Sequence, residues 1–158
     1  MSNTSANGGL QAARDLALRQ RDEAAARLAA ARQAWMGAQQ QLDQLQGYAH
    51  ETDARWAPGG AGGACTPEVM RHHYQFMQRL GHAIALQSGA VDGQARRVEE
   101  HAGLLRSAEA RLESLQQVLA RRDQQLAREA RRREQKATDE MAALQYRKQL
   151  RGQLAGGV

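Results

Sequence analysis

Histidine and cysteine are side chains of this sequence that could hold a metal or, for cysteine, attack a substrate. The 158 residues include five histidines and a single cysteine, Cys65. His50 and His73 fall at one level if the chain folds back between them, but no carboxylate or cysteine accompanies them at metal-ligand spacing. No base near Cys65 in the sequence would activate its thiol. We therefore expect no metal, no cofactor, no catalytic residue and no enzymatic activity.

A run of cations offers another chemistry, the binding of an acidic partner. Between Ala120 and Lys136, seven basic residues stand against three acidic ones. The basic residues, which we call the basic segment, are Arg121, Arg122, Arg128, Arg131, Arg132, Arg133 and Lys136. Such runs are usually solvated helix faces with some i,i+4 pairing. The net charge of +5 also permits nucleic acid, anionic lipid or an acidic protein as partner.

Two helical faces carry apolar and aromatic residues at 4-3-4 spacing, which places side chains on one side of a helix. The first face is Gln41, Leu45, Tyr48 and Thr52, and the second is Phe76, Leu80, Ala83 and Gln87. Two interpretations stay open for these residues. They either widen the contact between two helices, or they form an apolar patch that docks a partner.

Long helices in a coiled coil must position these residues. Every seventh residue is apolar in the series Met70, Met77, Ile84, Val91, Val98, Leu105, Leu112, Leu119 and Leu126. A helix with 3.5 residues per turn aligns them as one stripe, which another helix must cover. Two registers earlier in the chain can supply that cover. They are Leu28, Trp35, Leu42, Ala49 and Trp56, and Leu10, Ala17, Ala24, Ala31, Ala38 and Leu45.

These patterns predict an all-α fold, an antiparallel two-helix coiled-coil hairpin with a longer second helix. The helices are expected at 10–56 and 67–151, joined by a glycine-rich loop at 57–66, with disordered tails at 1–9 and 152–158. The second helix has a typical start, with a threonine, a proline and a glutamate in succession.

Folding the chain about residue 62 makes the two helices neighbours. Trp56 then lies level with Val69, Tyr48 with Met77, and Leu10 with Leu115. Leu10 is the first residue of this predicted helix, so no part of it lies beside helical residues after Leu115. Residues 116–151 of the second helix are therefore expected to project alone.

Composition argues against a compact globular domain and against a membrane protein. The hydrophobic fraction is 42%, mostly alanine and leucine, with only one Phe, three Tyr and two Trp. No apolar run approaches the roughly 20 residues that span a bilayer. The first residues lack a signal-peptide pattern, and the single cysteine fits a reducing compartment. We therefore expect a cytoplasmic protein.

The stretch from Arg133 to Ala142, Arg-Glu-Gln-Lys-Ala-Thr-Asp-Glu-Met-Ala, resembles the end of the second helix in the FliJ family of flagellar export proteins. The motif residues are Glu134, Gln135, Lys136, Asp139 and Glu140. The family's plan of two long helices joined at a tip also matches the predicted hairpin, so the resemblance covers nearly the whole chain.

The resemblance implies a non-enzymatic component of the flagellar type III export apparatus. Its expected partners are the export ATPase hexamer, which a stalk-like coiled coil binds and stimulates, the cytoplasmic part of the export gate membrane protein, and substrate chaperones. It would lie in the cytoplasm at the flagellar base, peripheral to the inner membrane only through these partners. We assign the ATPase contact to the basic segment.

The resemblance also implies a gate-docking surface at the hairpin tip. The family pattern Gln-x-x-x-Leu-x-x-Tyr is met by Gln41, Leu45 and Tyr48, and the pattern Phe-x-x-x-Leu-x-x-Ala by Phe76, Leu80 and Ala83. Thr52 and Gln87 depart from the family, which has an aromatic residue and a histidine there.

Two alternatives remain beside this interpretation. A basic coiled coil that binds nucleic acid fits the charge, but acidic residues are mixed into the basic segment and no aromatic residue interrupts it, so nucleic acid is not expected. The equivalent stalk protein of a virulence type III secretion system is physically similar to the flagellar one.

Overall fold

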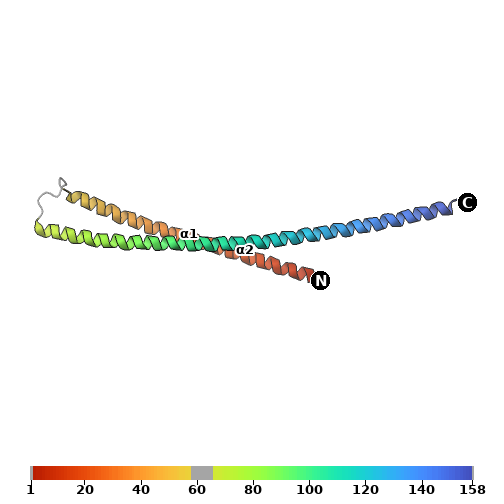
Figure 1. Cartoon of the computed structure of the whole chain (residues 1–158), viewed down its shortest axis with the longest axis horizontal. Helices are drawn as coiled ribbons and strands as arrows, with labels where there is room; N and C mark the ends of the chain where they lie inside the picture. Colours follow the sequence, from red (N-terminus) through yellow and green to blue (C-terminus); the bar gives the residue numbers. More distant parts are fainter. Residues whose placement is uncertain (1, 58–65, 158) are drawn as a thin grey trace. The chain divides into compact units, whose positions relative to one another are not determined.

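Two long α-helices make up the part of the chain that the structure describes. The computed structural model describes residues 2–57 and 66–157. Helix α1 spans Ser2–Trp56 with 55 residues, and helix α2 spans Pro67–Ala155 with 89 (Figure 1). Neither described range contains a strand. The prediction of an all-α two-helix hairpin with a longer second helix is confirmed.

Both helices extend beyond the predicted bounds. α1 begins at Ser2 instead of Leu10, so residues 2–9, which we expected to be disordered, are helical. α2 continues through Gly152 to Ala155, and the N–H of Gly156 donates to the carbonyl of Gly152 at 3.1 Å. A lone glycine costs a helix only about 1 kcal/mol relative to alanine. The expected loop at 57–66 lies almost wholly outside the described residues.

The start of α2 agrees with the sequence signal. The N–H of Met70 donates to the carbonyl of Thr66 at 3.2 Å, which closes the first helical turn. Thr66 is therefore the N-cap residue and Pro67 the first helical residue, where a missing N–H costs nothing. Glu68 places a negative charge at the positive end of the helix dipole.

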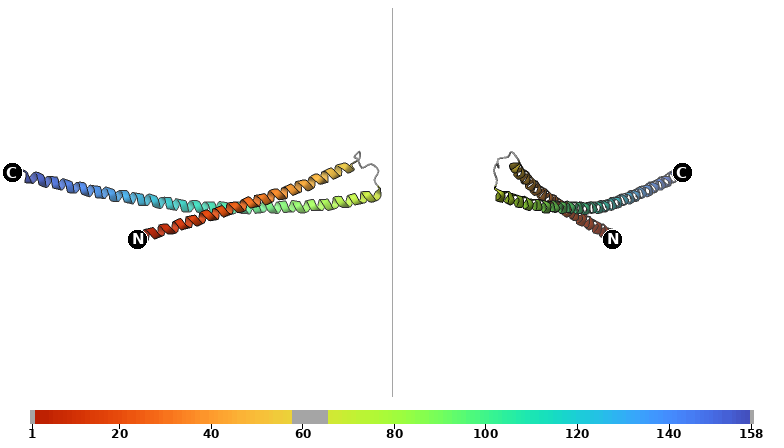
Figure 2. Two further views of the ribbon diagram at one scale, coloured as in Figure 1. Left: turned by 180° about the vertical axis from the view of Figure 1, so that it is seen from behind. Right: turned by 60° about the vertical axis from the view of Figure 1, so that its left-hand side comes forward.

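The chain divides into two compact units, which we describe separately. The hairpin unit consists of residues 17–111, and the distal unit of residues 1–16 and 112–158. In the hairpin unit, α1 and α2 run antiparallel and side by side toward the end where the chain turns (Figure 2). Its buried apolar side chains are Ala17, Leu28, Ala31, Leu42, Leu80 and Val91. Five of them lie on the predicted stripe or registers, so the heptad pattern marks the packed seam here.

α2 also has a second register, formed by the residues three positions after each stripe residue. The search for apolar residues at every seventh position did not find it, because several of its members are polar. Within the hairpin unit its members, none fully exposed, are His73, Leu80, Gln87, Gln94, His101 and Ala108. Several are polar, yet long polar side chains can cover apolar surface with their stems while their ends reach solvent or a partner. The opposing alanines of α1 leave room for them. The seam of the hairpin unit is therefore apolar on one side and mixed on the other.

The distal unit corrects the expected extent of the projecting helix. Leu119, which the sequence argument left exposed, is buried together with Leu112. Asn7 of α1 lines a cavity of about 210 Å³ with Arg122, Leu126 and Glu129 of α2. Since α1 is more than two turns longer than predicted, it accompanies α2 past residue 116. The uncovered part of α2 begins near residue 130.

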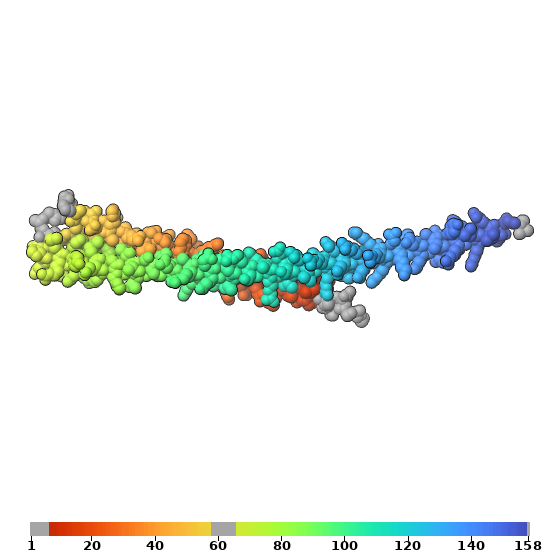
Figure 3. Space-filling view, in the orientation of Figure 1, coloured from red at the N-terminus to blue at the C-terminus, as the bar shows by residue number. Residues whose placement is uncertain are grey.

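Beyond Arg122, every residue of α2 is exposed. The C-terminal part of α2, coloured blue, has no second segment beside it in the view of Figure 3. No helix in the described part of the chain is long and apolar enough to cross a membrane.

We expect the seam to carry the stability of the hairpin unit. Leu80 is 8% exposed and Leu86 on the same helix is 64% exposed. Leu80→Ala should lower the free energy of unfolding by about 2–3 kcal/mol, because it leaves a cavity in the seam. Urea unfolding followed by circular dichroism at 222 nm measures the difference. Leu86→Ala is the matched control and should change the value by less than about 0.5 kcal/mol; equal losses in both variants would contradict a seam-based stability.

Candidate functional site

The first candidate surface lies in the hairpin unit, and we call it the tip patch. It consists of Gln41, Leu45, Tyr48, Phe76, Leu80 and Ala83. Tyr48 and Phe76 meet edge to face across the two helices, with ring centroids 6.1 Å apart and planes at 86°. This contact brings together the two helical faces that the 4-3-4 spacing predicted, and it agrees within one residue with the expected level of Tyr48.

Exposure divides the tip patch into a floor and a rim. Leu80 is buried, and Leu45 and Ala83 are intermediate, so these three pack in the seam. Tyr48 and Phe76 remain 52% and 38% exposed although they touch each other. The interpretation as a widened seam therefore holds for the floor, while the aromatic rim leaves apolar ring surface in solvent.

Gln87 ties the two helices together beside this patch. Its side-chain N–H group donates to the carbonyl of Ala38 at 2.9 Å and to the side-chain oxygen of Gln41 at 3.2 Å. A helix carbonyl already accepts one bond within its own helix, and its second lone pair is used here. Because a backbone atom is the acceptor, the bond fixes the level of α2 against α1 without depending on a flexible partner.

The two positions that depart from the family pattern both serve contacts within the chain. Gln87 makes the interhelical bonds, and the hydroxyl of Thr52 donates to the carbonyl of Tyr48 at 2.7 Å. Both side chains are only partly exposed. The surface available to a partner is therefore centred on the two aromatic rings and does not extend fully to these positions.

A second ring contact, between Trp56 and His73, was not predicted. The rings are stacked with centroids 4.3 Å apart and planes at 17°. Trp56 was expected level with Val69, one turn nearer the start of α2. Side chains lean toward the N-terminus of their own helix, so in an antiparallel pair the two rings lean toward each other. Both residues belong to seam registers, and this shared position in the seam is the sequence signal from which the contact could have been predicted.

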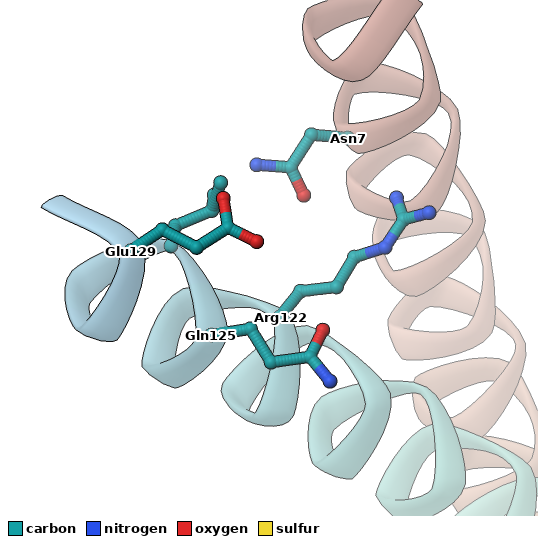
Figure 4. A pocket seen from close by; sticks show the side chains of 5 residues that line it. Asn7, Arg122, Gln125 and Glu129 are labelled. Atoms are coloured by element: carbon teal, nitrogen blue, oxygen red, sulfur yellow. The ribbon is translucent and has the colours of Figure 1, made fainter. Parts of the chain in front are cut away.

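The second candidate surface is the basic segment in the distal unit. All its members are exposed except Arg122, which is half-buried. Figure 4 shows Arg122 reaching from α2 toward α1 beside Asn7. The Oδ1 atom of Asn7 is buried there without a hydrogen-bond partner, and the cavity has room for water. Arg122 therefore belongs to the covered part of α2 and not to the free cationic surface.

The other cations are not neutralised by neighbours. The ion pairs of the described residues are Arg14–Asp15 and Arg21–Asp22, and neither involves the basic segment. The intrahelical pairing that usually accounts for such runs is thus missing from this one. The six exposed cations present their charge to solvent and can bind an acidic surface; they are Arg121, Arg128, Arg131, Arg132, Arg133 and Lys136.

The family motif lies on the uncovered helix. Its residues Glu134, Gln135, Lys136, Asp139 and Glu140 are all exposed. The nearby hydroxyl of Thr138 donates to the carbonyl of Glu134 at 2.9 Å. Since no motif residue is buried within this chain, packing of the hairpin does not require these residue types.

The structure adds a set of apolar residues that sequence reasoning missed. Met141, Leu144, Tyr146, Leu150 and Leu154 are exposed on the uncovered part of α2. No two of them are seven residues apart, and in the register of the stripe Leu126 is followed by a cation, Arg133. That change was the signal that the seam ends, and it separates these residues from the coiled coil. Large apolar side chains gathered on one lone helix are typical of a docking surface.

The described ranges hold no group of three His, Cys, Asp or Glu side chains able to bind a metal ion. Cys65 lies outside the described residues.

Comparison with known families gives one match. Residues 7–151 match the family model described as "Flagellar FliJ protein". No curated protein and no solved structure matches the chain.

The interhelical bonds of Gln87 predict a measurable contribution to stability. Gln87→Ala should lower the free energy of unfolding by about 1–2 kcal/mol, because two cross-helix hydrogen bonds are lost. Chemical denaturation checks this value. Gln78→Ala is the matched control, since among the described residues the Gln78 amide bonds only Tyr74, on the same helix, at 3.3 Å and in solvent. A loss in the control as large as in Gln87→Ala would show that helix propensity, not the cross-helix bond, is responsible.

Proposed function

Because this chain belongs to the FliJ family and so to the flagellar type III export apparatus, we propose that it is the stalk that couples the export ATPase to the export gate. In this proposal it binds the ATPase hexamer, promotes ring assembly and ATP hydrolysis, and exchanges with substrate chaperones. It acts by binding alone and carries out no reaction of its own.

The observation that carries the proposal is the uncovered part of α2, from about residue 130 to Ala155. It combines unpaired cations with large exposed apolar side chains. A partner protein can satisfy both, because interfaces join an apolar centre to a polar rim. Phosphate groups of nucleic acid would neutralise the cations but would leave Met141, Leu144 and Leu154 in water. We therefore favour a protein partner, and we assign the ATPase contact to this stretch.

The aromatic rim of the tip patch supports a separate contact with the gate. Tyrosine and phenylalanine provide large, rigid contact surfaces that lose little conformational entropy on binding. Tyr48 and Phe76 already hold each other in place by their edge-to-face contact. A partner that covers them would bury apolar area on a patch whose floor is fixed by Leu80.

The ATPase contact predicts a charge-dependent stimulation. The triple variant Arg131→Gln, Arg132→Gln, Arg133→Gln should bind the cognate flagellar ATPase about tenfold more weakly, because three charge contacts are lost. The ATP hydrolysis rate, titrated with full-length protein at physiological salt, measures this. A control with the same charge change, Arg19→Gln, Arg27→Gln, Arg96→Gln, should stimulate like wild type. If wild type does not stimulate and instead binds arbitrary DNA in a salt-sensitive way, the nucleic-acid alternative replaces the stalk.

The gate contact predicts that removal of the aromatic rim weakens docking. Tyr48→Ala combined with Phe76→Ala should weaken binding to the cytoplasmic part of the export gate by at least about tenfold, since buried aromatic anchors dominate interfaces. Isothermal titration calorimetry measures the affinity. Tyr74→Ala removes a ring that is more exposed than either rim residue and lies two residues from Phe76, and this variant should bind normally. Wild-type affinity in the double variant would remove the tip patch from the gate contact.

A further inference from the structure

The hairpin unit has a second apolar surface, on the side of the seam away from the tip patch. Trp35 and Met36 of α1 and Ala95 and Val98 of α2 line a groove of about 400 Å³, flanked by Arg32 and Glu99. Trp35 and Met36 are 37% and 49% exposed. Neither the tip patch nor the uncovered part of α2 uses any of these residues.

Heptad positions place the groove and the tip patch on opposite flanks of the seam. Trp35 and Val98 belong to the registers that pair on one side of the seam, and Arg32, Met36, Ala95 and Glu99 lie next to them. The other side is built on Ala38 and Gln87, which are joined by a hydrogen bond. Tyr48 and Phe76 border that second side. A partner on the groove would therefore leave the aromatic rim uncovered.

The charges at the groove identify an occupant. Arg32 comes from α1 and Glu99 from α2, and both are exposed on opposite walls of one groove. They form no ion pair with each other or with another described residue. A surface with one unpaired cation and one unpaired anion, one on each wall, is complementary to itself.

We propose that this groove is the interface of a homodimer in which two hairpin units lie face to face with their tips at the same end. A two-fold axis along the hairpin places α1 of each copy against α2 of the other. Arg32 of one copy then meets Glu99 of the other, and symmetry makes the pair twice. Trp35 and Met36 of each copy then face Ala95 and Val98 of the other copy and lose contact with water.

The charges also select this orientation over the opposite one. A two-fold axis across the helices would place α1 against α1, so that each Arg32 approached the same cation of the other copy. Like charges in contact oppose association. The parallel arrangement is therefore the one that the charged walls favour.

Complementary charge reversal tests the dimer. Sedimentation velocity of the full-length chain under reducing conditions should show concentration-dependent dimers for wild type. Arg32→Glu makes both walls acidic, and Glu99→Arg makes both walls basic. Each variant alone should therefore associate at least about tenfold more weakly than wild type. An equimolar mixture of the two variants should recover wild-type association, since both heterodimer pairs are again of opposite sign.

Two further variants separate this interface from other causes. Met36→Gln should weaken association through the apolar centre. Arg97→Glu, a charge reversal away from the groove on α2, should leave association unchanged, and circular dichroism should show equal helicity in all variants. The proposal is overturned if wild type stays monomeric, or if the mixture does not associate better than its components. Dimers formed by exchange of helices between hairpins would be indifferent to the reversals, and that result would also overturn it. None of these readouts depends on the export ATPase or the gate.

Discussion

The apolar stripe of α2 is the constraint on which the rest of the structure depends. A row of side chains from Met77 to Leu119 cannot remain in water, and the hydrophobic effect offers roughly 25 cal/mol for each Å² that another surface covers. α1 provides that surface with small residues, and Ala17 and Ala31 let the helices approach closely. No large side chain in the described residues is fully buried, so stability comes from a long shallow seam and not from a core.

The end of the stripe explains where binding surface becomes available. At Leu126 the apolar series stops, and Arg133 stands in the next position of the same register. A cation there cannot be covered by a second helix without loss of its hydration. α2 therefore continues as a helix whose cations and apolar side chains have no partner within its unit. The same residues that cannot extend the seam are the ones free to bind another molecule.

The two sides of the seam between α1 and α2 differ in chemistry within the hairpin unit. One side of the seam carries Gln87 and its bonds to the backbone of α1, with the aromatic rim beside it. The other side carries the groove of Trp35 and Met36 with one charge on each wall. A two-helix rod has little interior, so nearly every residue near the seam also borders the surface. Stability and recognition must therefore be divided between neighbouring positions, as Leu80 and Phe76 illustrate.

By itself the sequence determined the helices, the heptad register and the start of α2 at Pro67, because these depend on spacing and on local capping chemistry. It also located the two faces that meet at Tyr48 and Phe76. It did not determine that α1 starts at Ser2, since Ser, Asn and Gly are weak helix formers. Only the tertiary structure decided that Arg122 is half-buried while Arg131 is free, that Leu119 is covered, and that Gln87 bonds to Ala38. Periodicity shows which side chains share a face, whereas exposure depends on what stands opposite that face.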